Sequence, residues 1–164
     1  MSTAIEKASL QEVVKNLNKE IKGIKGRSLK GMIEGVIEVR RDMDKTSPLI
    51  PVGETGNLRQ SWFVTTSKGT TPQGKSPNFK GRNAEKMASE HSTVKTVVVG
   101  RAQAKSQKGP VVAFGFSANY AVYVHEMYGA HFRRPGAGAG FFVASIKRNK
   151  GKILNAIKEN AKVR

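Results

Sequence analysis

One stretch of the chain has the residue types and spacing of a nucleotide-binding loop. Gly69-Thr-Thr-Pro-Gln-Gly-Lys-Ser76 fits the pattern G-x-x-x-x-G-K-[ST], in which backbone amides and a lysine hold phosphates and a hydroxyl holds magnesium. That chemistry needs a helix directly after the loop, because the helix N-terminus supplies amide donors. Here Pro77-Asn-Phe-Lys-Gly81 follows, which has no helical pattern, and no aspartate occurs after Asp44 to hold the metal. We therefore interpret the match as chance and expect no nucleotide hydrolysis.

Histidines and a glutamate lie close together later in the chain. His125-Glu126 and His131 lack the H-E-x-x-H spacing that places two zinc ligands on one helix face. Glu126 directly follows His125, which is poor geometry for the acid that orients a histidine in a serine triad. The segment Gly136-Ala-Gly-Ala-Gly140 follows Arg-Arg-Pro instead of a buried strand, so it reads as a lead-in to a helix and not as a dinucleotide loop. We expect no enzyme, no metal site and no cofactor.

The net charge is large and unevenly distributed. The 164 residues carry 29 Lys/Arg and 12 Asp/Glu, for a formal net charge of +17. Residues 1–60 hold 11 basic and 8 acidic residues, a net of +3, whereas residues 61–164 hold 18 and 4, a net of +14. Such a field attracts polyanions. Two interpretations stay open: contact with nucleic acid or an acidic protein surface, or a solvated basic surface that keeps the protein soluble.

Length and composition indicate one domain, residues 1–164, with a core that needs no disulfides. The chain has no cysteine, which excludes disulfides and thiolate metal sites. No apolar run approaches membrane-spanning length, and the N-terminus lacks the apolar core of a secretory signal. We expect a protein made and kept in a cytoplasm, without membrane contact.

The expected elements follow from apolar periodicity. Apolar residues recur at spacings of three and four from Leu10 to Ile37, which predicts two helices, or one long helix with a glycine-weakened centre, over about residues 3 to 45. A second such pattern predicts a C-terminal helix over Phe141–Val163, with Gly151 as a soft spot. Residues 119–128 fit a strand or a helical turn, and we favour the turn.

Three segments have strand character: Trp62–Ser67, Thr93–Gly100 and Val111–Ser117. The last two predict an antiparallel hairpin around a basic loop, Arg101–Pro110. The fold class is therefore α+β, with an N-terminal helical segment, a small antiparallel β-sheet and a C-terminal helix packed on one face.

A polar, basic insertion is expected at about residues 68–92, with a short capped helix near residues 83–91. This insertion and the predicted hairpin loop hold the residues that we expect to face DNA or an acidic partner: Lys75, Lys80, Arg82, Lys86, Arg101, Lys105 and Lys108.

The junction Thr46–Trp62 is predicted to be a hinge between helix and sheet. Pro48 and Pro51 end the helix, and two glycines allow a tight turn. Trp62 should pack in the core. For Arg59 two roles stay open, an ion pair at the edge of the core or a contact between subunits.

Two motifs in this order resemble a known family. The first motif follows a proline turn: Thr55-Gly-Asn-Leu-Arg-Gln-Ser-Trp62. The second precedes Arg134-Pro135 and Phe141-Phe142: Asn119-Tyr-Ala-Val-Tyr-Val-His-Glu-Met-Tyr-Gly129. Together they are similar to the tail-completion or head–tail joining proteins of tailed bacteriophages. The resemblance spans about residues 10–160. Two features depart from the family pattern, the long basic insertion and Tyr128-Gly-Ala-His131 in place of glycine-threonine. The motif residues carried over are Thr55, Gly56, Leu58, Arg59, Ser61, Trp62, Tyr120, Tyr123, His125, Glu126, Pro135 and Phe141.

The resemblance implies a structural virion protein of the neck. Such a protein would form a ring, with six copies as the expectation and twelve as the alternative, between the portal or connector and the tail terminator or tail tube. Non-specific contact with genomic DNA is implied as well. The competing hypothesis is a non-enzymatic DNA- or RNA-binding accessory protein.

Overall fold

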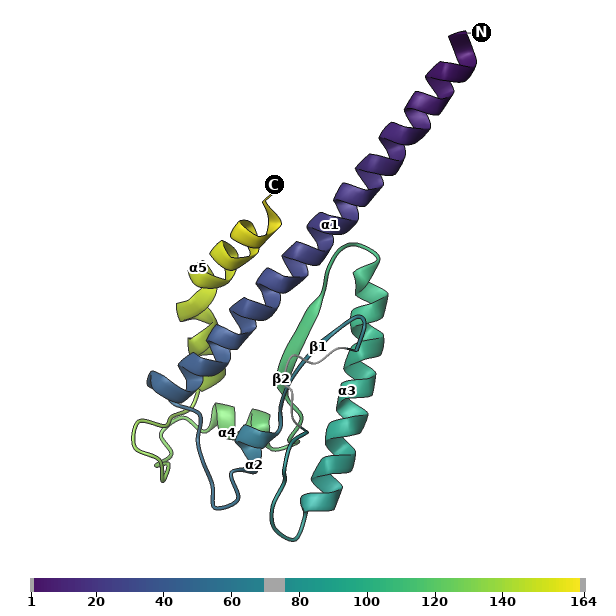
Figure 1. Cartoon of the computed structure of the whole chain (residues 1–164). Coiled ribbons are helices and arrows are strands. Elements are labelled where there is room, and N and C mark those ends of the chain that lie inside the picture. Colours follow the sequence, from purple (N-terminus) through teal and green to yellow (C-terminus); the bar gives the residue numbers. More distant parts are fainter. Residues whose placement is uncertain (1, 70–75, 163–164) are drawn as a thin grey trace.

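The structure is a computed structural model that describes residues 2–69 and 76–162, with side chains from Glu12 on in those ranges. It has the expected α+β class, with a long N-terminal helix, a two-stranded antiparallel sheet and a C-terminal helix (Figure 1). Its elements are α1 (Ser2–Lys45), α2 (Asn57–Gln60), β1 (Trp62–Thr66), α3 (Ala84–Ser106), β2 (Val112–Phe116), α4 (Ala121–Glu126) and α5 (Phe141–Ala161).

The N-terminal segment is one continuous helix, so of the two predictions, two helices or one long helix, the second is correct. Two of its glycines, Gly31 and Gly35, bring α5 close to α1, and none of its glycines interrupts the helix. A Cβ atom on Gly31 would lie 2.5 Å from the carbonyl oxygen of Ala156, and one on Gly35 would lie 3.0 Å from the side chain of Ile153. Only glycine allows this approach of the two helices. Farther along, the Ser145 hydroxyl donates to the carbonyl of Val39 at 2.9 Å.

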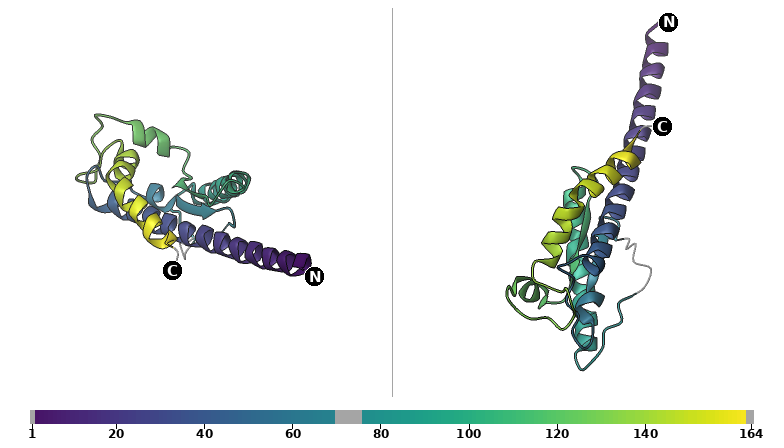
Figure 2. Two further views of the ribbon diagram at one scale, coloured as in Figure 1. Left: turned by 90° about the horizontal axis from the view of Figure 1, so that it is seen from above. Right: turned by 90° about the vertical axis from the view of Figure 1, so that its left-hand side faces the viewer.

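The first part of α1 extends well past the rest of the molecule (Figures 1 and 2). The side chains from Glu12 to Lys22 are exposed, including the apolar ones: Val13 is 58% exposed, Val14 54%, Leu17 58% and Ile21 41%; Ile24 is half-buried. We call the α1 segment from residue 12 to residue 24 the arm.

The sheet pairs strands that are far apart in the sequence. β1 pairs with β2 in antiparallel register, from Trp62 opposite Phe116 to Thr66 opposite Val112. The strands expected at Trp62–Ser67 and Val111–Ser117 are thus confirmed. All five residues of β1 are buried.

The predicted strand Thr93–Gly100 is wrong, and so is the hairpin that it would form, because this segment lies inside α3. His91, Val94, Val98 and Ala102 recur at spacings of three and four and form one helix face; His91 and Ala102 are buried. Packing of that face outweighs the preference of valine and threonine for strands.

The length of α3 also alters two predictions, the basic hairpin loop and the short helix near residues 83–91. Arg101 and Lys105 lie within this helix and Lys108 lies in the turn after it, so the basic hairpin loop is also wrong. The short helix expected near residues 83–91 is the first part of α3.

The core lies between α1, the sheet and α5. Trp62 is 4% exposed, and its ring centroid is 5.7 Å from that of Phe114, 5.2 Å from Phe116 and 6.1 Å from Phe142. These edge-on contacts confirm the predicted core position of Trp62. In the described ranges, none of the helices has the length and apolar character needed to cross a membrane.

Candidate binding groove and the motif residues

The junction after α1 holds two distant parts of the chain together. The Leu49 N–H donates to the carbonyl of Gly136 at 2.8 Å, and the Gly138 N–H donates to the carbonyl of Leu49 at 3.2 Å. Gly56 has φ of 67°, a left-handed conformation that favours glycine, and it precedes the short helix α2. The hinge from α1 to β1 is therefore fixed by the loop that leads into α5.

Asn57 is a structural residue that the sequence did not reveal. It is buried, its side-chain Nδ2 donates to the carbonyl of Lys80 at 2.8 Å, and its Oδ1 accepts from the Lys80 N–H at 2.9 Å. A single amide thus ties α2 to the segment before α3. The asparagine occupies a variable position of the first motif, so no residue-type signal marked it.

Asp44, at the end of α1, joins the two motifs. Its carboxylate lies 2.6 Å from Arg40 Nη1, 2.9 Å from Arg59 Nη2 and 3.5 Å from Arg134 Nη1. Arg134 also donates to the backbone carbonyls of Asp44, at 2.7 Å, and Ile50, at 3.1 Å. Arg59 therefore makes an ion pair within the chain, the first of its two expected roles. Besides the ion pair expected for Arg59, the i,i+4 spacing of Arg40 and Asp44 is a sequence signal for this cluster.

Three guanidinium groups share one carboxylate, so the cluster has surplus positive charge. Burial lowers the pKa of the Arg40 guanidinium, Asp44 raises it, and the charge of Arg59 lowers it again, with a net lowering. In the described ranges, Arg59 Nε is buried without a hydrogen-bond partner. The cluster thus keeps unused donor capacity beside the groove described next.

A groove of about 590 Å³ lies between the C-terminal half of α1 and β1. Its lining combines apolar side chains with three arginines. The Arg40 guanidinium carbon is 6.0 Å from the Trp62 ring centroid. Such a groove suits a segment that combines apolar side chains with an acidic group, and its volume is in the usual range of binding pockets. Its lining residues are Ile37, Arg40, Arg41, Val52, Gly56, Arg59, Gln60, Trp62, Val64, Ser76 and Pro77.

The remaining residues of the first motif are structural. Leu58 is 4% exposed, and the buried Ser61 hydroxyl donates to the Leu58 carbonyl at 2.8 Å. Thr55 is exposed, and its Oγ1 accepts from the Asn57 N–H at 3.4 Å. Thr55 and Leu58 also line a smaller cavity of about 240 Å³ together with Tyr120 of the second motif.

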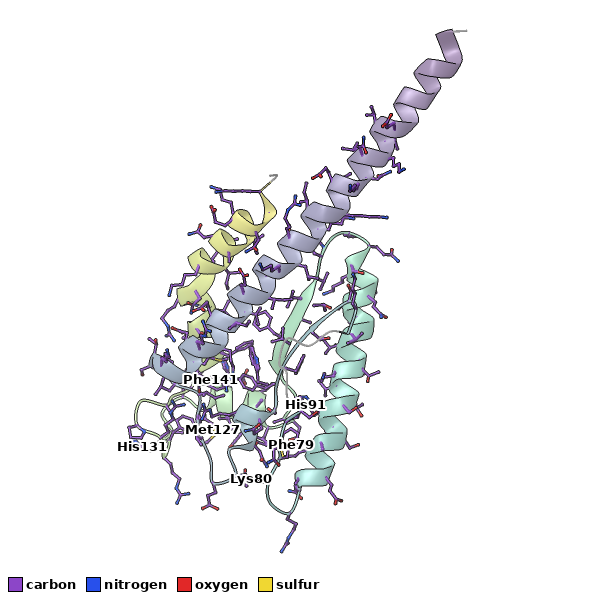
Figure 3. All side chains as sticks on the ribbon, viewed as in Figure 1. Phe79, Lys80, His91, Met127, His131 and Phe141 are labelled. Carbon is purple, nitrogen blue, oxygen red and sulfur yellow. The ribbon has the colours of Figure 1, made fainter. Side chains whose placement is uncertain are left out.

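The second motif holds α4 against the start of α5. The His125 ring lies 5.3 Å from that of Phe141, which is 1% exposed, and the Val143 N–H donates to His125 Nε2 at 3.4 Å. Burial raises the pKa of Tyr120. Figure 3 shows Phe141 inside the molecule and His131 at its outer edge. The motif positions Tyr123, Glu126 and Pro135 are exposed.

The basic residues do not form one track. Lys80, Arg82 and Lys86 lie before or in the first turn of α3, and Arg101, Lys105 and Lys108 lie at its other end. About 22 Å of helix separates Lys86 from Arg101, at about 1.5 Å per residue. The exposed face between them is uncharged: Ser89, Thr93, Thr96, Val97 and Gly100. Lys75 lies outside the described residues.

The nucleotide-loop pattern has no helix behind it. Residues 70–75 lie outside the described ranges, and α3 begins only at Ala84, with residues 76–83 not helical. Within the described ranges, no group of three His, Asp or Glu side chains is arranged to hold a metal ion. A scan of protein-family models and searches of curated proteins and of solved structures gave no match to this chain.

Proposed function

We propose that this protein is a structural subunit of the neck of a tailed bacteriophage, which joins the portal or connector to the tail as a ring. The observation that carries the proposal is the arm. Its four large apolar side chains are 41% to 58% exposed on a helix that extends past the body. A contiguous apolar stripe of this kind is typical of a surface that a protein partner covers. We therefore take the chain to be a subunit of an assembly.

The structural roles of the motif residues support the same proposal. Arg59 from the first motif and Arg134 beside the second meet at Asp44, and Trp62 packs against Phe142. The two motifs that carry the resemblance thus build one scaffold.

The charge fits a position beside DNA or an acidic neighbour. A ring multiplies the charge of +17 by its number of copies, so an anionic partner or counterions must offset the repulsion between subunits. Contacts of lysine and arginine with phosphates are independent of sequence, as DNA passage through a neck requires.

Oligomeric state and DNA binding, measured together, test the proposal. We expect light scattering after size-exclusion chromatography, and electron microscopy, to show rings at high protein concentration or after addition of the portal. DNA binding should be weak at physiological salt. A protein that stays monomeric under all these conditions and binds DNA tightly, with a steep salt dependence, would favour the nucleic-acid-binding accessory protein instead.

Head–tail joining tests the basic residues. Neutralising Lys80, Arg82 and Lys86 to glutamine should leave the fold intact but reduce the joining of filled heads to tails. The matched control neutralises three exposed lysines of α5: Lys147, Lys150 and Lys152. Equal infectivity of both variants and the wild type would show that the charge near α3 has no role in joining.

A further inference from the structure

The apolar stripe of the arm continues the face of α1 that α5 covers. Leu17, Ile24 and Gly31 are separated by seven residues, two helical turns, and so lie on one face. Ile21 and Gly35 are fourteen residues apart, about four helical turns, and so they lie on this face as well. Since α5 packs directly on Gly31 and Gly35, the stripe is that same face without a covering helix.

The arm has no partner from its own chain because α5 ends too early. Asn160, at the end of α5, donates to the carboxylate of Glu34 at 2.8 Å, and α5 stops at Ala161. The part of α1 before residue 25 therefore extends by about 30 Å, at about 1.5 Å per residue. Figures 1 and 2 show this extension from three directions.

The groove lies on the other side of α1. Ile37 lines the groove and follows Gly35 by two residues, which is about 200° around a helix. The arm stripe and the groove thus point in roughly opposite directions. Unless two copies exchange their arms reciprocally, a contact between arm and groove joins copies head to tail, and such a heterologous contact generates a ring when the rotation between copies closes.

The two surfaces are complementary in chemistry. The groove is lined by apolar side chains, among them the exposed Ile37, and by three arginines, of which Arg40 and Arg59 share the Asp44 carboxylate. The arm has an apolar stripe flanked by Glu20, which follows Leu17 by three residues. Its lysines, Lys15, Lys19 and Lys22, lie about 140–200° around the helix from Leu17, on the opposite face. Glu20 is only loosely paired within the chain, at 3.8 Å from Arg27, and its side chain is 57% exposed.

We propose that the arm of one copy docks in the arginine-lined groove of the next copy. The arm would place Val13, Leu17 and Ile21 on the apolar side chains that line the groove, and Glu20 would pair with the arginines of that lining. This inference rests on the proposed ring and names the contact that builds it. The main competing occupant of the arm is the arm of another copy, which would leave the groove free.

Cysteine cross-linking tests the contact, because the chain has no cysteine of its own. Protein with Leu17→Cys is mixed with protein carrying Gln60→Cys, at an exposed position of the groove, and the mixture is oxidised mildly. We expect a disulfide-linked heterodimer on a non-reducing gel, and a ladder from the double variant. The control is Lys15→Cys, whose side chain lies about 160° from that of Leu17 around the helix.

The cross-linking results either support or overturn the docking of the arm in the groove of the next copy. Dimers from Leu17→Cys alone, without more in the mixture, would establish arm–arm pairing and overturn the inference. Equal cross-linking by the Lys15→Cys control would overturn it too, since the contact would then not depend on the stripe.

A charge substitution separates this inference from the proposed function. Leu17→Glu should weaken assembly at least tenfold in sedimentation velocity, whereas Lys15→Glu should change it little, and both should keep the thermal stability of the wild type. Rings that form equally well with Leu17→Glu would refute arm docking but leave the neck function standing. Wild-type protein that never assembles, alone or with the portal, would refute both.

Discussion

Gly31 lies where α1 and α5 are closest, so Gly31→Ala probes the contact that organises the fold. The new Cβ would be 2.5 Å from the Ala156 carbonyl oxygen, whereas ordinary contacts begin near 3.4 Å, so the helices would have to separate by about 0.9 Å. The clashing atom belongs to a helix backbone and cannot rotate away. Overpacking of this kind costs up to about 3 kcal/mol, and alanine regains about 1 kcal/mol of helix propensity. The expected net loss of unfolding free energy is about 2 kcal/mol.

Gly26→Ala is the matched control, because it lies in the same helix with nothing within 4 Å of its added Cβ. It should stabilise the protein by up to about 1 kcal/mol. Urea titration and thermal melts followed by circular dichroism measure both variants. Gly31→Ala should lower Tm by about 4–8 °C, and the control should raise it slightly. If Gly31→Ala proved as stable as Gly26→Ala, the close packing of α1 on α5 would be wrong.

Three further predictions concern the core and the ion-pair cluster. Trp62→Ala should cost about 3–5 kcal/mol in urea titration, and unchanged stability would contradict its core position. Burial, with a smaller contribution from Lys95, lowers the pKa of His91 below 6.5, so the unfolded chain binds the proton first as pH falls. Unfolding free energy should therefore decline below about pH 6.5, and His91→Phe should remove that slope; an unaltered slope would refute the assignment. Asp44→Ala leaves three guanidinium groups without their carboxylate and should cost about 2 kcal/mol, since the site is partly exposed. The control, Glu38→Ala, removes the carboxylate that pairs with the exposed Arg41, and it should lower the unfolding free energy by under about 0.5 kcal/mol.

Periodicity and turn chemistry predicted most of the elements. The apolar spacing from Leu10 to Ile37 predicted helix over about residues 3 to 45 but left open whether it was one helix or two, and the proline-glycine junction predicted its end and the turn into β1. The aromatic strand beginning at Trp62 was recognised as part of the core. These signals are local, because they depend on residues a few positions apart.

What the sequence could not reveal depends on contacts between distant segments. The run Thr93–Gly100 is rich in β-branched residues, and only the fit of one helix face against the sheet decides for a helix. The glycines Gly31 and Gly35 looked like weak points in a helix until the position of α5 was known. The cluster at Asp44 needed an arginine from position 134, ninety residues away, and no spacing rule connects the two.

The packing of α5 on α1 also constrains how the chain can fold. The two helices lie far apart in the sequence, and β1 pairs with β2 only after the whole of α3, so the contacts that join these elements are non-local. Contacts of this kind slow folding, because loop closure precedes the gain from contact. During synthesis, α1 leaves the ribosome first and its apolar face stays uncovered until α5 follows. A chain that lacks α5 would thus leave the face of α1 around Gly31 and Gly35 uncovered.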